Sequence, residues 1–295
     1  MDTLESLSDA LETAGDIQSI VRTMKALSSV SIRQYEHAEA AMADYSHTVE
    51  LGLMALLRQR MGAGLSLPGA ERGTGRQAMI VIGSDRGLCG GYNDKITRFA
   101  LSRMSDGPIV LGVIGARVMA RLEADGRRAD AVHPLPGSVE GLTRLVQAVI
   151  VEIDRWTRTE GVGEVWLLHN RRDGRTTAKP QAHRVLPLPT TYLHKLADTD
   201  WPGSSLPLFR MDPERLMSWL VQQRLFVVIY RALAEALASE HASRLAAMQA
   251  AERNIEERRD NLRALYRLRR QETITRELLD VVSGYEAVSS ADQAG

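Results

Sequence analysis

The stretch Glu214–Ser283 reads ERLMSWLVQQRLFVVIYRALAEALASEHASRLAAMQAAERNIEERRDNLRALYRLRRQETITRELLDVVS, and it contains neither glycine nor proline over roughly 70 residues. Because these two residues interrupt helices most often, the stretch predicts one continuous α-helix. At 1.5 Å per residue such a helix would be about 100 Å long, which is too long for the core of a compact domain. We therefore expect it to pair with another helix, to be held by partners, or both.

A second long helix is predicted at the N-terminus. From Ile17 to Leu56, apolar or small residues recur at alternating steps of three and four, which is a coiled-coil period. Asp16 is one candidate N-cap, and a start near Thr3 is the other. The first cluster of breakers is the Gly- and Pro-rich segment 62–75.

Residues 76–200 have a different pattern, in which short apolar runs alternate with helical patterns. This alternation predicts a mainly parallel sheet with helical crossovers. Strands are expected at 78–83, 109–114 and 164–169, helices at 93–104, 116–124 and 138–158, and an edge strand interrupted by two prolines at 181–193.

The predicted fold class is therefore α/β with long α-helices: an antiparallel coiled coil of the N- and C-terminal helices, with an inserted Rossmann-like α/β domain. Residue numbers paired across the coiled coil should sum to roughly 270, which places Met24 near residues 244–248. Beyond about Leu268 the C-terminal helix should project alone, with an apolar tip. The expected parts are helix 1–61, linker 62–75, domain 76–200, linker 201–213, helix 214–288 and tail 289–295.

The composition excludes several classes of protein. Lysine plus arginine and aspartate plus glutamate both number 37, so the zero net charge predicts no general attraction to nucleic acid. The arginine-rich run 253–270 is interleaved with acidic residues and indicates a solvated, mixed-charge helix face. The single cysteine, Cys89, allows no internal disulfide and favours a reducing compartment. We expect neither a signal peptide nor a membrane-spanning helix.

The segment SDRGLCGGYN, residues 84–93, is the strongest candidate for chemistry. Glycines between a strand and a helix often bind phosphate. The spacing of Gly83, Gly87, Gly90 and Gly91 matches neither the dinucleotide motif nor the P-loop, so a tight structural turn is the favoured interpretation. Cys89 is expected to be a packed thiol rather than a nucleophile, and the scattered histidines predict no metal site.

Three segments resemble one family, the gamma subunit of F-type ATP synthases. These segments are IQSIVRTMKALSSVSIR at 17–33, SDRGLCGGYN at 84–93, and LASEHASRLAAMQAAERN at 237–254 followed by YRLRRQETITRELLDVVSGYEAV at 266–288. The resemblance implies a central rotor shaft that couples ion flow to conformational change at catalytic beta subunits. It implies no catalytic residue or cofactor in this chain. The implied partners are the alpha, beta and epsilon subunits and the membrane ion-carrying ring, at the cytoplasmic face of the inner membrane, without nucleic acid or direct membrane insertion.

The resemblance also assigns residues. Met24, Arg244, Gln271 and Thr275 match positions that contact beta, and the family loop corresponds to Asp85, Arg86, Gly87, Cys89, Gly90 and Gly91. The acidic opening, with Asp2, Glu5 and Asp9, departs from the family's basic start and suggests a divergent, alternate bacterial ATPase. Two other functions stay open at this point: a coiled-coil scaffold with an α/β head, and a nucleotide-binding enzyme that uses the loop 83–95.

Overall fold

The computed structural model describes residues 3–62, 75–104, 108–174, 177–205, 207 and 209–292, with side chains as far as residue 283. Two compact units make up the chain: residues 27–246, and residues 1–26 together with 247–295. The expected linker 62–75 falls almost entirely outside the described residues. The elements, in chain order, are α1 Leu4–Gly62, β1 Arg76–Ile82, α2 Tyr92–Arg103, β2 Ile109–Ile114, α3 Ala116–Ala124, β3 Ala131–His133, a 3-10 turn Val139–Gly141, α4 Leu142–Thr159, β4 Val162–Asp173, β5 Thr177–Leu186, α5 Thr190–Asp198 and α6 Pro213–Asp292.

Both long helices begin at N-caps that the sequence supplies. The Thr3 hydroxyl accepts a hydrogen bond from the amide of Ser6 at 3.2 Å, so α1 begins near Thr3 and not at Asp16. At α6, the Asp212 carboxylate accepts from the amide of Arg215 at 3.0 Å. Pro213 then occupies the first helical position, where its missing N–H costs nothing.

The sheet is mixed, with the strand order β3-β2-β1-β4-β5. β1 runs parallel to β2 and to β4, whereas β5 is antiparallel to β4. The expected edge strand 181–193 is wrong in its second half, because β5 ends at Leu186 and α5 begins at Thr190. Leu193, Leu196 and Ala197 have helical spacing and are buried, so burying this apolar face outweighs extension of the strand.

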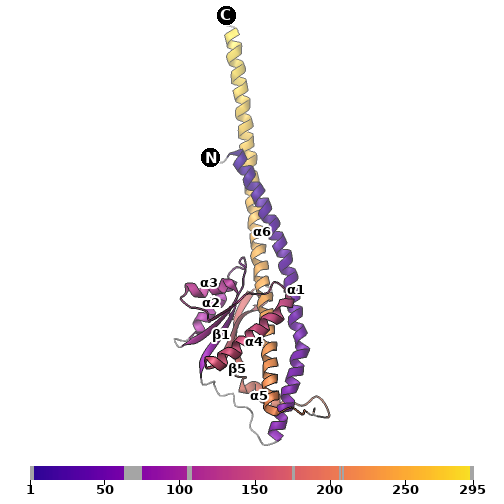
Figure 1. Ribbon diagram of the computed structural model, residues 1–295. Helices are drawn as coiled ribbons and strands as arrows, with labels where there is room; N and C mark the ends of the chain where they lie inside the picture. Colours follow the sequence, from indigo (N-terminus) through magenta and orange to yellow (C-terminus); the bar gives the residue numbers. More distant parts are fainter. Residues whose placement is uncertain are drawn as a thin grey trace. The chain divides into compact units, whose positions relative to one another are not determined.

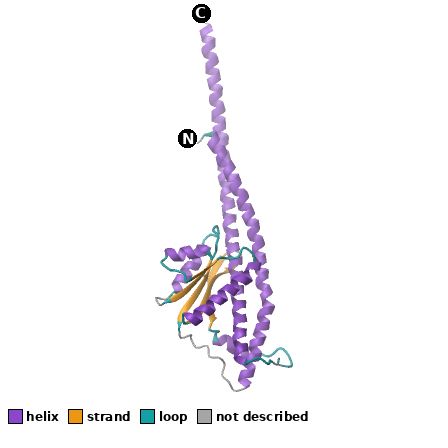
Figure 2. Cartoon of the chain, viewed as in Figure 1, coloured by secondary structure: helices purple, strands orange, loops and turns teal. Residues whose placement is uncertain are grey.

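Helices cover both faces of the sheet. On one face, Met79 of β1 packs in a cluster with Ile96 of α2 and Val118 of α3. On the other face, Ile80 packs in a cluster that includes Trp156 of α4 and residues of α1 and α6. Figures 1 and 2 show α2 and α3 on the side of the sheet opposite to α4. The sheet is therefore the middle layer of an α/β domain that is built onto the two long helices.

Within the unit 27–246, α1 and α6 pair antiparallel in the predicted register. Arg231 contacts Glu39 at 3.2 Å and Arg60 contacts Glu214 at 2.5 Å, so the paired residue numbers sum to 270 and 274. Gly52 lies at a close approach, since a Cβ there would meet the side chain of Leu220 at 2.8 Å. A larger residue there would require the Leu220 side chain to move.

The unit formed by residues 1–26 and 247–295 has the same antiparallel pairing. Gln18 donates to Glu256 at 3.3 Å, and Arg22 contacts Glu252 at the same distance. Leu262 is 5% exposed, whereas none of the residues 263–283 is buried. Exposed apolar side chains follow along this part of α6: Leu265, Leu268, Ile274, Leu278, Leu279, Val281 and Val282.

Candidate functional site

The SDRGLCGGYN loop joins β1 to α2 and stays attached to the sheet through Asp85. One carboxylate oxygen accepts from the amide of Ala116 at 2.8 Å, and the other accepts from the amide of Leu135 at 2.8 Å. Asp85 thus satisfies an N–H at the start of α3 and one in the segment after β3. The carboxylate is used to hold three segments of backbone together at the carboxyl ends of the strands.

The inner side of the loop is closed by a buried polar cluster. The side-chain oxygen of Asn93 accepts from the amide of Ser84 at 3.0 Å, and its amide nitrogen donates to the Ser84 hydroxyl at 2.7 Å. Cys89 is 3% exposed, with its sulfur 3.6 Å from the Asn93 nitrogen. Burial raises the pKa of the Cys89 thiol, so the unreactive protonated form is favoured. These contacts are those of a packed thiol.

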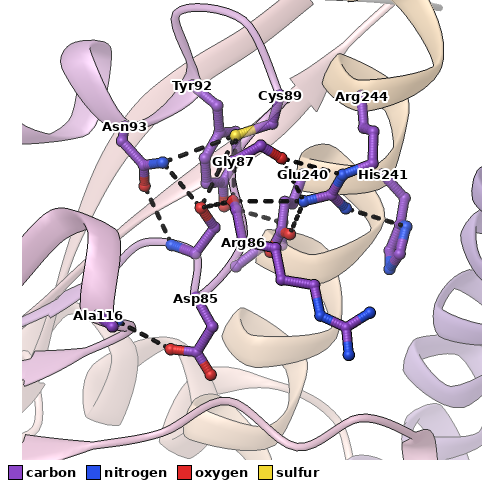
Figure 3. Close-up of polar contacts among 12 residues, drawn as sticks. Asp85, Arg86, Gly87, Cys89, Tyr92, Asn93, Ala116, Glu240, His241 and Arg244 are labelled. Carbon is purple, nitrogen blue, oxygen red and sulfur yellow. Dashed lines mark hydrogen bonds and ion pairs between the residues drawn. The ribbon is translucent and has the colours of Figure 1, made fainter. Parts of the chain in front are cut away.

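Arg244 of α6 binds the outer side of the loop. Its guanidinium donates to the carbonyl of Gly87 at 3.2 Å and to that of Arg86 at 3.5 Å. The same group forms an ion pair with Glu240 at 2.6 Å, and Arg244 is 5% exposed. Figure 3 shows these contacts converging from α6 onto the loop. We call this arrangement of Arg244, Glu240 and the two loop carbonyls the loop clamp.

The clamp lies in a desolvated setting that shifts the ionisation of its neighbours. Burial raises the pKa of Glu240, although the charge and hydrogen bond of Arg244 oppose this effect. Burial, together with the charge of Arg244, lowers the pKa of His241 to about 4. His241 is therefore a neutral ring at pH 7, and it stacks on Tyr35 with centroids 5.7 Å apart. The clamp is thus a buried ion pair beside the neutral His241 ring, and the charges of Asp85 and Arg86 also act on Glu240.

The clamp keeps one residue in a strained conformation. Leu88 has φ 62°, which is uncommon for a leucine, and its side chain is 62% exposed. Gly90, next but one, has φ 57° without such strain. The loop therefore presents an exposed apolar side chain on a fixed backbone.

Three residues of the site were not predicted from the sequence: Leu88, Glu240 and the buried Tyr92. The Tyr92 hydroxyl donates to the carbonyl of Ala236 at 2.9 Å.

The other predicted contact residues lie elsewhere on the helices. Gln271 and Thr275 are exposed on the same stretch of α6, and the Thr275 hydroxyl donates to the carbonyl of Gln271 at 2.8 Å. Met24 is half-buried on α1. It belongs to a different unit from Arg244, so their expected proximity stays a prediction.

Two kinds of feature are absent from the described residues. No group of three or more His, Cys, Asp or Glu residues with the geometry of a metal site occurs among them. Across the same residues, we find no helix whose length and apolar character would let it cross a membrane.

Comparisons with known proteins give a consistent result. The family model described as ATP synthase matches residues 3–288. The chain is 29% identical to the ATP synthase gamma chain of Actinobacillus pleuropneumoniae serotype 3, over 92% of this chain and 94% of that protein. It is 28% identical to the gamma chain of Sinorhizobium fredii, over 98% of this chain and all of that protein.

The fold is similar to a solved rotor. The rotor of the Euglena gracilis mitochondrial ATP synthase superposes with a TM-score of 0.65 at 16% identity, over 92% of this chain and 99% of that chain. At this identity the likeness supports the fold alone. Because the family model spans nearly the whole chain, this protein belongs to the ATP synthase family, and it is similar to gamma chains of that family over nearly their full length.

Proposed function

We propose that this chain is the central-stalk rotor subunit of a membrane ion-translocating F-type ATP synthase. The observation that carries the proposal is the antiparallel pairing of two long terminal helices around an inserted α/β domain, in a chain similar to gamma chains end to end. Such a subunit performs no bond chemistry. It couples ion flow through the membrane ring to conformational change at the catalytic beta subunits.

The partners follow from this function. They are the alpha and beta subunits of the catalytic hexamer, the epsilon subunit and the membrane ion-carrying ring. The exposed apolar side chains of α6 beyond Leu262 support a surface that is covered in the assembly. The chain acts as a peripheral component of the membrane complex, and we place it at the cytoplasmic face of the inner membrane.

For the contacts with beta we propose Gln271 and Thr275 as direct participants. Both are exposed, and their polar side chains can form hydrogen bonds that differ from one rotor angle to the next. Coupling requires such differences, because a contact equal at all angles biases none of them. Met24 is proposed as a further contact on α1.

Arg244 is proposed to act at beta through the loop clamp. Its guanidinium is already engaged by Glu240 and by the carbonyls of Gly87 and Arg86. Few of its five N–H donors remain free for a partner. We therefore assign Arg244 the task of fixing the loop backbone, so that the exposed Arg86 and Leu88 are presented in one position.

Rotation is the direct test of the proposal. A chain with Cys89→Ser and Arg128→Cys, labelled at the exposed new thiol, is assembled with the alpha and beta subunits fixed to a surface. ATP should drive rotation of the label in one direction, and omission of ATP should stop it. A complex that assembles and hydrolyses ATP without turning the label would contradict the proposal.

A further inference from the structure

A cationic pocket lies in the α/β domain on the side of the sheet that packs against α6, away from the loop clamp. It is an open pocket with a volume of about 250 Å³, lined by residues of β4, β5 and α6. His169 and Arg171 alternate along β4 and therefore face the same side of the sheet. Gln181 of β5 is the cross-strand partner of His169. These strands supply the floor of the pocket.

The opposite wall consists of side chains from one face of α6. Arg224, Arg231 and Glu235 line the pocket at helical spacing. Three guanidinium groups, counting Arg171, therefore surround a cavity with a single lining carboxylate. That carboxylate is already engaged, since Glu235 lies 2.9 Å from the His169 ring and 3.9 Å from Arg171.

Arg224 has unused hydrogen-bonding capacity. Its guanidinium stacks over the ring of Tyr192 at 4.7 Å, and within the described part of the chain its N–H groups donate to no partner. Arg231 pairs with Glu39 at 3.2 Å, which leaves other N–H donors of its planar guanidinium free. His169 is 1% exposed, and its second ring nitrogen has no hydrogen-bond partner among the described residues. A pocket with this excess of donors is complementary to an oxyanion.

We propose that this pocket binds a phosphate-class oxyanion, with Arg224 and Arg171 as its principal ligands and Arg231 at its rim. The volume holds one phosphate group with water but leaves little room for a whole nucleotide. A bound phosphate would connect α6 to β4 across the pocket. It would thus fasten the α/β domain to the helix more firmly as phosphate fills the site.

The histidines supply an independent signal of occupancy. Partial burial and the neighbouring His169 lower the pKa of His183, whose ring stacks on that of His169 at 5.4 Å. A nearby anion favours the imidazolium form. Phosphate should therefore raise the pKa of His183, which NMR of the imidazole resonances can follow in the full chain.

The experiment titrates the purified full-length chain with inorganic phosphate at constant ionic strength, by calorimetry and by the His183 resonance. Saturable binding is expected, and Arg224→Gln should weaken it about tenfold, the effect of one charge-assisted hydrogen bond. Arg171→Gln should act similarly and gives a second variant if the first fails to fold. Arg128→Gln, which removes an exposed arginine far along the chain from the pocket, should change nothing.

Two further titrations separate the possible sources of the phosphate group. If ATP competes with inorganic phosphate, the site accepts a terminal phosphate, and if ATP does not compete, it takes the free ion; both results support an oxyanion site. Absence of saturable binding by the native chain would overturn the proposal. Equal weakening by Arg128→Gln and Arg224→Gln would also overturn it, because binding would then follow net charge alone.

Discussion

Replacement of Arg244 by methionine should release the SDRGLCGGYN loop. Arg244→Met keeps much of the aliphatic volume but removes the ion pair with Glu240 at 2.6 Å and the bond to the Gly87 carbonyl at 3.2 Å. The side chains of Arg244 and Glu240 are 6% and 7% exposed, so the change leaves a carboxylate without a partner inside the protein. Breaking such a buried pair costs about 3–5 kcal/mol.

The lower end of this range applies here. The pKa of Glu240 is already raised by burial, and without Arg244 the carboxyl can take up a proton instead of remaining charged. We therefore expect a loss of about 3 kcal/mol, which corresponds to roughly a hundredfold change in the equilibrium for opening the loop.

Cys89 provides the assay, because it is the one cysteine in the sequence and is 3% exposed in the loop. Its rate of labelling by a thiol reagent should rise about a hundredfold in Arg244→Met, if opening is fast relative to labelling. The control Arg231→Met removes an exposed ion pair from the same helix and should raise the rate less than about fivefold. Glu240→Leu combined with Arg244→Met leaves neither charge of this pair in the protein. The double variant should label at least tenfold more slowly than Arg244→Met alone. Labelling of Arg244→Met within threefold of the native chain would refute the reasoning.

Four other outcomes are expected. Asp85→Ala leaves two backbone N–H groups without acceptors and should lower the free energy of unfolding by about 1–3 kcal/mol in urea. Gly115→Ala should cost more in thermal unfolding than Gly126→Ala, because both have positive φ but only the former Cβ meets backbone, at 2.9 Å. Burial lowers the pKa of His241 to about 4, so the contribution of its neutral ring to the free energy of unfolding is complete above about pH 6.5 and is lost as the pH falls toward 4. His241→Phe should therefore reduce the loss of stability over this pH range by up to about 3 kcal/mol. In the assembled enzyme, Gln271→Ala should lower the ions pumped per ATP hydrolysed without unfolding the chain, and unchanged pumping would remove Gln271 from the contacts.

The long helices could be predicted because their signals are local. An absence of breakers and a three–four step in apolar residues are properties of consecutive residues, and the order of segments then dictated antiparallel pairing near a sum of 270. Two short elements, β3 and α5, could not be found in this way. β3 has three residues, too few for a pattern, and is held by pairing with β2. Helix α5 was concealed by Pro187 and Pro189, although its buried leucines have helical spacing.

The residues of the loop could be identified from the sequence, but their contacts could not. Glu240 and Arg244 stand at i, i+4 spacing, which on a solvated helix indicates an ordinary surface pair. Only the tertiary fold shows that the pair is buried and that Arg244 faces the carbonyls of the loop. A resemblance can assign a position to a contact without showing what the chain itself does with that side chain.

One stripe of residues on α6 forms hydrogen bonds to the α/β domain. Ala236, Glu240 and Arg244 are four residues apart and lie on one stripe of α6. Ala236 accepts from Tyr92 of α2, and Arg244 donates to the loop at Gly87. The hydrophobic effect is non-directional. Hydrogen bonds at Ala236 and Arg244, about two turns apart, help to fix the register of the helix against the domain, so a twist applied to one is passed to the other. A rotor needs this property in order to pass torque between its shaft and its base, so loosening the clamp should reduce stiffness as well as stability.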